Sequence, residues 1–494
     1  MKRVKYALLL LWVCCGSTIF GQRAFDNNFV YYTDSVGDVY LDIPLLTLPS
    51  QLQAYRTTGG FFASYMNPGF ENSLAYSTDL YTAAHFGLKK AIRFKNSTFM
   101  QIFTQRLAIS AFDVAVMQLP LGVSWLHEEY HRGVMTKYGI NSFNEVLLFH
   151  LWSGSIAVSH EKDEEMAMLC DNHHPDFVRL MSAGHEAVVD LNRNLQHNEF
   201  FYQQHLDNEV LYWMHSFQNL LNLMTCANGT GEDGINERNR IETSVEMRDF
   251  TGLDMNAWIH ALCNPELPYA ARGTHPSGVG IDRYISYDDI SDEGKKYLKR
   301  QVGLDLLNFI SPMQFGFSRF RLAHTDESDC YGNFAFRHYL TAFGSDASLD
   351  LYFQKSPGCK IYVTLHDYSN YNHHFGGLEV GVVDYMSLLS RLTPYPILIG
   401  GTMMGWVQPK EMSFYTETGV FGGLVKVRAS LLSNVLTPYA EVGWKSKGWV
   451  AGNANLDDGF FLRAGLRWKI ASEASHKTVW SCYYTRPRPS ANHQ

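Results

Sequence analysis

A strict two-residue alternation marks the stretch FFLRAGLRWKI at residues 460–470. Aromatic and aliphatic side chains occupy one set of positions, whereas arginine, glycine and lysine fill most of the other set. Successive side chains of a β-strand point to opposite faces, so this pattern predicts a strand with one apolar and one polar face. Similar runs occur near residues 334–341, 347–354, 360–367, 377–385, 395–406, 412–428 and 436–450. Together they predict about eight antiparallel strands, enough for a sheet or a small closed barrel.

The last of these strands resemble the final hairpin of Gram-negative outer-membrane β-barrels. The resemblance rests on the runs YAEVGW at 439–444 and GLRW at 465–468, which combine glycine, aromatic residues and one apolar face. Such barrels usually end on an aromatic residue, whereas 24 residues follow Ile470 in this chain. A half-buried sheet outside any membrane alternates in the same way, so both interpretations stay open.

The rest of the chain divides by composition and period. Residues 1–21 have a basic start, an apolar run at 7–13 and a small residue at position 21, which predicts a cleaved secretory signal. The pair Cys14-Cys15 leaves a lipoprotein signal as an alternative. We expect an extended or β segment at 22–70, a helical domain at 71–325, the antiparallel β domain at 326–470 and a tail at 471–494. The predicted fold class is therefore α+β.

The composition excludes several classes of protein. The chain of 494 residues is 46% hydrophobic and 18% charged, with a formal net charge of −8. This apolar content excludes a disordered chain, and the acidic balance gives no support for general nucleic-acid binding. No GxSxG, Walker A or Rossmann glycine motif is present. Six cysteines follow the leader without CxxC spacing, so disulfides and free thiols both stay open.

The motif HEEYH at residues 127–131 carries the strongest indication of chemistry. On a helix, His127 and His131 are one turn apart, so both imidazoles leave the same face and can bind one tetrahedral zinc ion. Glu128 lies beside this face and is expected to act as a general base toward water rather than as a ligand. We expect the helix to begin at Pro120 and to end at Tyr138-Gly139.

An interpretation without metal is also open for this motif. The polar cluster could lie at a solvated helix end, where Glu128 or Glu129 would form a salt bridge with Arg132.

A catalytic zinc site needs a third protein ligand, for which residues 182–190 (SAGHEAVVD) offer the best candidate. They fall on a predicted helix over 175–195, with Glu186 and Asp190 one turn apart. HExxH followed by ExxxD on a later helix resembles the gluzincin metallopeptidases. The resemblance implies that Glu186 is the third zinc ligand and that Asp190 orients His127. His185, on another face of the same helix, is the alternative third ligand.

The predicted function is that of an exported zinc-dependent hydrolase, a metallopeptidase that acts on a peptide or protein substrate, with Zn²⁺ as its cofactor. We expect it in the periplasm or the outer membrane of a Gram-negative bacterium. The alternative is an outer-membrane β-barrel protein whose helical periplasmic domain is not catalytic. A third hypothesis is a binding or assembly protein without metal.

Overall fold

A computed structural model describes residues 37–60, 63–94, 97–148, 158–230, 240–324, 329–355, 358–386, 395–471 and 480–481. The predicted signal at 1–21 lies outside the described residues, and so do 472–479 and 482–494 of the predicted tail. The helices are α2 (Ser50–Thr58), α3 (Gly69–Ala91), α4 (Thr98–Val116), α5 (Val123–Lys137), α6 (Asp163–Asn172), α7 (His174–Tyr202), α8 (Glu209–Ala227), α10 (Asp254–Cys263) and α11 (Asp292–Asp305).

The strands follow the predicted alternation closely. They are β1 (Val39–Leu48), β2 (Phe143–Asn144), β3 (Val158–Ser159), β4 (Phe320–His324), β5 (Asp329–Leu340), β6 (Ser345–Lys355), β7 (Cys359–Ser369), β8 (His374–Met386), β9 (Ile397–Pro409), β10 (Gly419–Leu431), β11 (Leu436–Lys445), β12 (Gly459–Ala471) and β13 (Trp480–Ser481). The fold is therefore α+β, with most helices before the main run of strands, as predicted.

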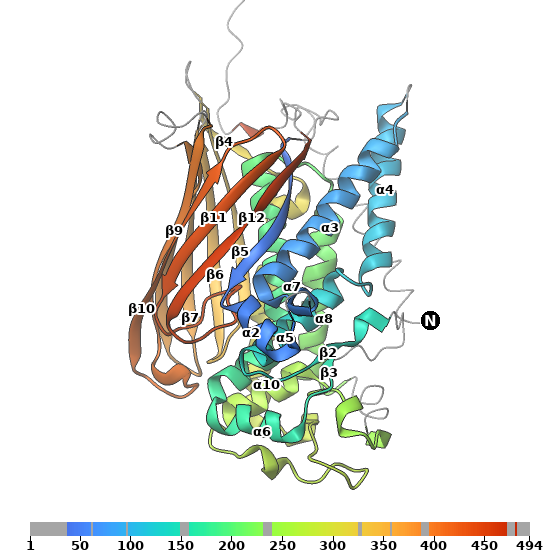
Figure 1. The fold of residues 1–494 in the computed structure, drawn as a ribbon, viewed down its shortest axis with the longest axis vertical. Helices are drawn as coiled ribbons and strands as arrows, with labels where there is room; N and C mark the ends of the chain where they lie inside the picture. Colours follow the sequence, from blue (N-terminus) through green and yellow to red (C-terminus); the bar gives the residue numbers. More distant parts are fainter. Residues whose placement is uncertain are drawn as a thin grey trace, which may run out of the picture.

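One large sheet carries the order β1-β12-β11-β10-β9-β8-β7-β6-β5-β4-β13 (Figure 1). Neighbours from β4 to β12 are antiparallel, β1 joins antiparallel to β12, and β13 lies parallel to β4. The two ends of this order are not paired, so the described strands form an open sheet rather than the closed barrel that the sequence also allowed. Helix α3 lies along the free side of β1, where Asp79 accepts the backbone N–H of Asp42 at 3.0 Å.

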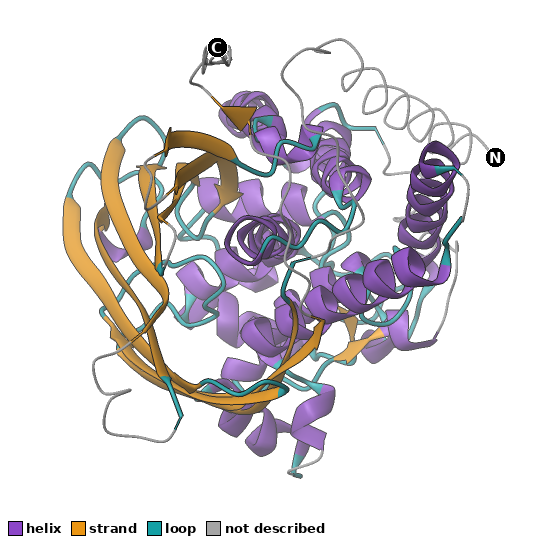
Figure 2. Cartoon of the chain, turned by 90° about the horizontal axis from the view of Figure 1, so that it is seen from above, coloured by secondary structure: helices purple, strands orange, loops and turns teal. Residues whose placement is uncertain are grey.

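The polar face of this sheet is turned toward the helices. Figure 2 shows the strands curving around part of the helical layer, with the convex side facing away from it. Helix α7 makes polar contacts with several strands across the concave side, from Arg193 to Glu379 of β8 at 2.9 Å and from Tyr202 to Asp384 at 2.6 Å. The outward positions are mostly apolar and many are exposed.

The helix that carries HEEYH begins later than predicted. Leu121 has a positive φ of 68° and Gly122 is extended, so the first helical residue is Val123 rather than Pro120. Its end matches the prediction, because Gly139 takes the left-handed conformation that commonly follows a helix. Among the described helices, none combines the length and apolarity of a membrane-spanning segment.

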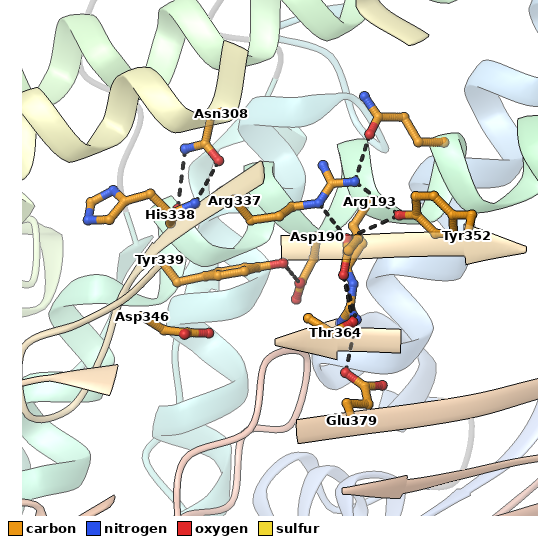
Figure 3. Close-up of polar contacts among 12 residues, drawn as sticks. Asp190, Arg193, Asn308, Arg337, His338, Tyr339, Asp346, Tyr352, Thr364 and Glu379 are labelled. Carbon is orange, nitrogen blue, oxygen red and sulfur yellow. Dashed lines mark hydrogen bonds and ion pairs between the residues drawn. The ribbon is translucent and has the colours of Figure 1, made fainter. Parts of the chain in front are cut away.

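Asp350 on β6 anchors the contact between α7 and the sheet. It bonds to the guanidinium groups of Arg193 and Arg337, and Tyr352 also donates to it at 3.1 Å. Figure 3 shows the two arginines converging on this region from α7 and β5.

Candidate metal centre

The two histidines of HEEYH meet a carboxylate from another helix. Their rings lie 4.9 Å apart on α5, and His131 is fully buried while His127 is 8% exposed. Asp254 is the first residue of α10, and its Oδ2 lies 3.0 Å from Nε2 of His127 and 3.4 Å from Nε2 of His131. Ligand atoms at about 2.0–2.1 Å from a tetrahedral zinc ion lie about 3.3 Å from one another. The two distances between Asp254 and the imidazoles are close to that spacing, and the contact with His127 is also a hydrogen bond between the two side chains.

The orientation of the His131 ring also suits a metal ligand. Its Nδ1 donates to the carbonyl oxygen of Leu180 at 2.6 Å, which directs Nε2 toward Asp254. Apart from Asp254 Oδ2 at 3.4 Å, Nε2 of this buried ring has no polar partner. Metal-binding histidines commonly donate their second nitrogen to a carbonyl or carboxylate in this way, because the bond holds the ring and leaves the other lone pair for the metal. The residues present thus fit a zinc ion.

The structure places Glu186 away from this group, contrary to the sequence prediction. Its Oε1 accepts from Arg179 at 2.9 Å and from the backbone N–H of Gly452 at 2.8 Å. The residue of α7 that contacts His127 is Gly184. Glu186 is two positions further along, about 200° around the helix, so it cannot reach the histidines from the same face. Asp254 takes the position that the resemblance assigned to Glu186.

Asp190 and His185 also have other partners. Asp190 accepts from the hydroxyl groups of Tyr130 and Tyr339, both at 3.1 Å, whereas Nδ1 of His127 has no hydrogen-bond partner. Asp190 therefore does not orient His127. His185 belongs to a second group of three, in which its Nε2 lies 2.9 Å from Asp305.

This second group holds elements together through bonds within the protein. His338 places Nδ1 3.2 Å from Asp305 and Nε2 2.9 Å from Gln301, so both of its nitrogens are engaged. Asn308 donates to the same Asp305 oxygen at 2.8 Å. The group connects α7, α11 and β5, and all three of its residues are buried, whereas the Asp254 side chain of the first group is 18% exposed.

No known protein family, curated protein or solved structure matches this chain. The site is therefore interpreted from its own geometry. The carboxylate beside the histidines that sequence reasoning missed is Asp254, which is the first residue of α10 after Asp249-Phe250-Thr251-Gly252-Leu253. An acidic residue in the first turn is common in helices, so no local pattern distinguishes it.

Glu128 lies where negative charge is concentrated. It is 7% exposed, and burial raises its pKa well above the ordinary value, with Asp254 and Asp249 raising it further. Burial, together with the charge of Asp254, also raises the pKa of Asp249 to about 7. A divalent cation held by the histidines and Asp254 would offset this repulsion. Glu129 instead pairs with Arg132, as the metal-free interpretation expected, but both side chains are buried rather than at a solvated helix end.

Gly184→Ala is expected to weaken zinc binding at least about tenfold. A Cβ atom at this position would lie 2.2 Å from Nε2 of His127, so the ring would have to move away from Asp254. Zinc affinity measured by competition with a chelating dye would test this. The matched control is Gly303→Ala in α11, where nothing lies within 4 Å of an added Cβ. We expect the control to keep its zinc affinity and to gain about 0.5–1 kcal/mol of stability. Equal zinc affinity in both variants would contradict the role of His127.

Proposed function

We propose that this protein is an exported zinc-dependent hydrolase that cleaves peptide bonds. The observation that carries the proposal is the convergence of Nε2 of His127, Nε2 of His131 and Oδ2 of Asp254 beside Glu128. Export, to the periplasm or outer membrane of a Gram-negative bacterium, rests on the composition of residues 1–21. The choice of a peptide substrate rests on HExxH and its resemblance to zinc metallopeptidases.

Each residue of the group has a defined part in the proposed reaction. His127, His131 and Asp254 would hold the metal, and the Leu180 carbonyl keeps the His131 ring in place. Zinc, when bound, supplies a Lewis acid that polarises a carbonyl oxygen and lowers the pKa of water. Glu128 accepts the proton of the attacking water and donates it to the leaving amine. The Asp254 side chain is 18% exposed, so solvent reaches this edge of the group.

The proposal is tested with the purified chain lacking residues 1–21. We expect about one zinc ion per chain by elemental analysis and cleavage of a quenched fluorescent peptide mixture. Removal of the metal with 1,10-phenanthroline should abolish cleavage, and added zinc should restore it. A chain that stays metal-free after zinc supplementation would overturn the proposal, as would cleavage that the chelator does not affect.

A second candidate is an outer-membrane protein whose helical part does not catalyse. The exposed apolar face of the sheet favours it, although a membrane location of the sheet is also compatible with the hydrolase. Zinc bound without any peptide cleavage would support this candidate over the hydrolase.

A further inference from the structure

The sheet has its charged side chains inside and its apolar side chains outside. Arg428 of β10, Glu441 of β11 and Arg463 of β12 are cross-strand neighbours on the concave side. The residues next to them in sequence, Val427, Val442 and Leu462, point to the convex side and form a row of their own there. In a sheet with one face exposed to water, the apolar face normally packs on the core and the polar face is the exposed one. This sheet has the opposite arrangement.

The register makes the outer surface continuous. One row crosses seven strands in the order Ile361, Val382, Gly401, Val427, Val442, Leu462 and Leu48. A second row crosses from β6 to β12 in the order Leu351, Val363, Val380, Met403, Val425, Trp444 and Phe460. Neither row contains a charged side chain, and the indole N–H of Trp444 is the one side-chain group in them that can form a hydrogen bond. We call the surface formed by these two rows the outward face.

Much of the outward face is uncovered by the described chain. Val427 is 47% exposed, Met403 68% and Phe460 78%. Contiguous apolar surface of this extent is rare on proteins that are surrounded by water, and it indicates a partner or a membrane.

Lipid is the occupant that fits the shape. The sheet is convex on this side (Figure 2). The eight strands from β6 to β12 and β1 extend about 38 Å around the curve, at about 4.8 Å per strand. A second copy of the chain is convex on the same side, so it would contact only a narrow strip of this width. Acyl chains are fluid and can follow a curved surface over its whole width.

Aromatic side chains lie at both ends of the outward face. Phe421, Trp444 and Phe460 are exposed near the connections to the helical layer, and Tyr385, Tyr395 and Trp468 are exposed near the opposite connections. Phe460 and Trp468 lie on the same strand, about 26 Å apart at about 3.3 Å per residue, or about 20 Å along the normal for a strand tilted by about 40°. This is close to the apolar band of about 25 Å, with aromatic girdles, of sheets embedded in outer membranes.

One edge of the sheet, that of β1, has polar partners for two of its backbone groups. Asp79 of α3 accepts the N–H of Asp42 with both oxygens at 3.0 Å, and the Tyr65 hydroxyl donates to the Leu45 carbonyl at 2.9 Å. Backbone groups within hydrocarbon must be satisfied by the protein itself. The contacts at Asp42 and Leu45 satisfy two backbone groups of β1 on the side where no further strand pairs with it.

From these observations we infer that the outward face lies in the hydrocarbon of a lipid bilayer. The centre at His127, His131 and Asp254 lies on α5 and α10, which are on the helical side of the sheet and away from the outward face (Figure 1). This inference does not depend on the proposed hydrolase activity.

The first test is flotation of the full chain lacking residues 1–21 with unilamellar vesicles of dilauroylphosphatidylcholine, into which it is refolded from urea. We expect the protein to float with the vesicles. Val427→Lys should reduce the floating fraction at least fivefold, because it places a charge in the middle of the band. The matched control Thr418→Lys lies in the exposed loop before β10 and should float like the parent.

Three results would overturn the inference. They are a folded parent that stays at the bottom of the gradient, a soluble dimer that does not bind the vesicles, and a Val427→Lys variant that floats like the parent. A second measurement does not depend on whether the Val427→Lys variant folds. Brominated acyl chains should quench the parent's tryptophan fluorescence, and the double variant Trp444→Phe/Trp468→Phe should lose at least half of that quenching. Unchanged quenching in the double variant would also overturn the inference.

Discussion

Asp254→Ala is expected to lose bound zinc, whereas Glu186→Gln is expected to keep it. Asp254 supplies one of three converging ligand atoms, and its removal should weaken zinc binding by at least about 100-fold, more than the loss of an outer hydrogen bond would. Glu186 is engaged with Arg179 and Gly452, and the glutamine can retain a hydrogen bond to either. Elemental analysis of both variants beside the parent, after dialysis against a weak chelator, would measure the difference.

The comparison separates two assignments of the third ligand directly. The gluzincin resemblance predicts that Glu186→Gln loses zinc and that Asp254→Ala retains it, which is the reverse of what the geometry predicts. Loss of stability could release zinc from either variant, so the far-ultraviolet circular dichroism of each should be recorded with its zinc content. Zinc retained by a folded Asp254→Ala would exclude the carboxylate as a ligand.

Glu128→Gln is expected to reduce peptide cleavage by about 100- to 10,000-fold while zinc stays bound. This loss corresponds to about 3–5 kcal/mol of transition-state stabilisation. The amide has nearly the same shape but cannot accept a proton, and Glu128 is not one of the three converging ligands. Cleavage rates at saturating zinc, together with zinc content, would check both parts of the prediction.

The control for Glu128→Gln is Glu266→Gln, an exposed position after α10. It removes the same charge without touching the centre, so its cleavage rate should match that of the parent. If Glu128→Gln cleaved peptides at the parent rate, Glu128 could not be the general base. If it lost zinc as well as cleavage, the residue would have a structural part in holding the metal.

Local periodicity predicted much of the fold. The alternation at 460–470 corresponds to β12, and the helix expected at 175–195 lies within α7. The same reasoning placed His127 and His131 on one helical face, because residues four apart on a helix are neighbours whatever surrounds them. The prediction for the N-terminal segment was partly wrong. An extended or β segment was expected at 22–70, which agrees with β1, but α2 and the start of α3 also lie there.

The remaining features depend on contacts between distant parts of the chain. β1 pairs with β12, Glu186 meets the loop at Gly452, and Asp254 reaches α5 from the start of α10. No repeating pattern in the sequence indicates these pairings, because each depends on how whole helices and strands pack against one another. A glycine at 184 brings α7 close to His127 and directs Glu186 elsewhere, so the helix that was expected to supply the third ligand supplies the packing surface instead.

The sequence by itself determined the local features of this protein: the two-faced strands, the helices and the pair of histidines on one face. These follow from spacings of two and four residues, which backbone geometry converts directly into shared faces. Only the tertiary structure decided which carboxylate joins the histidines and which face of the sheet is turned outward. Those outcomes depend on which elements pack together, and a ligand set or an outer surface exists only after distant residues have been brought together.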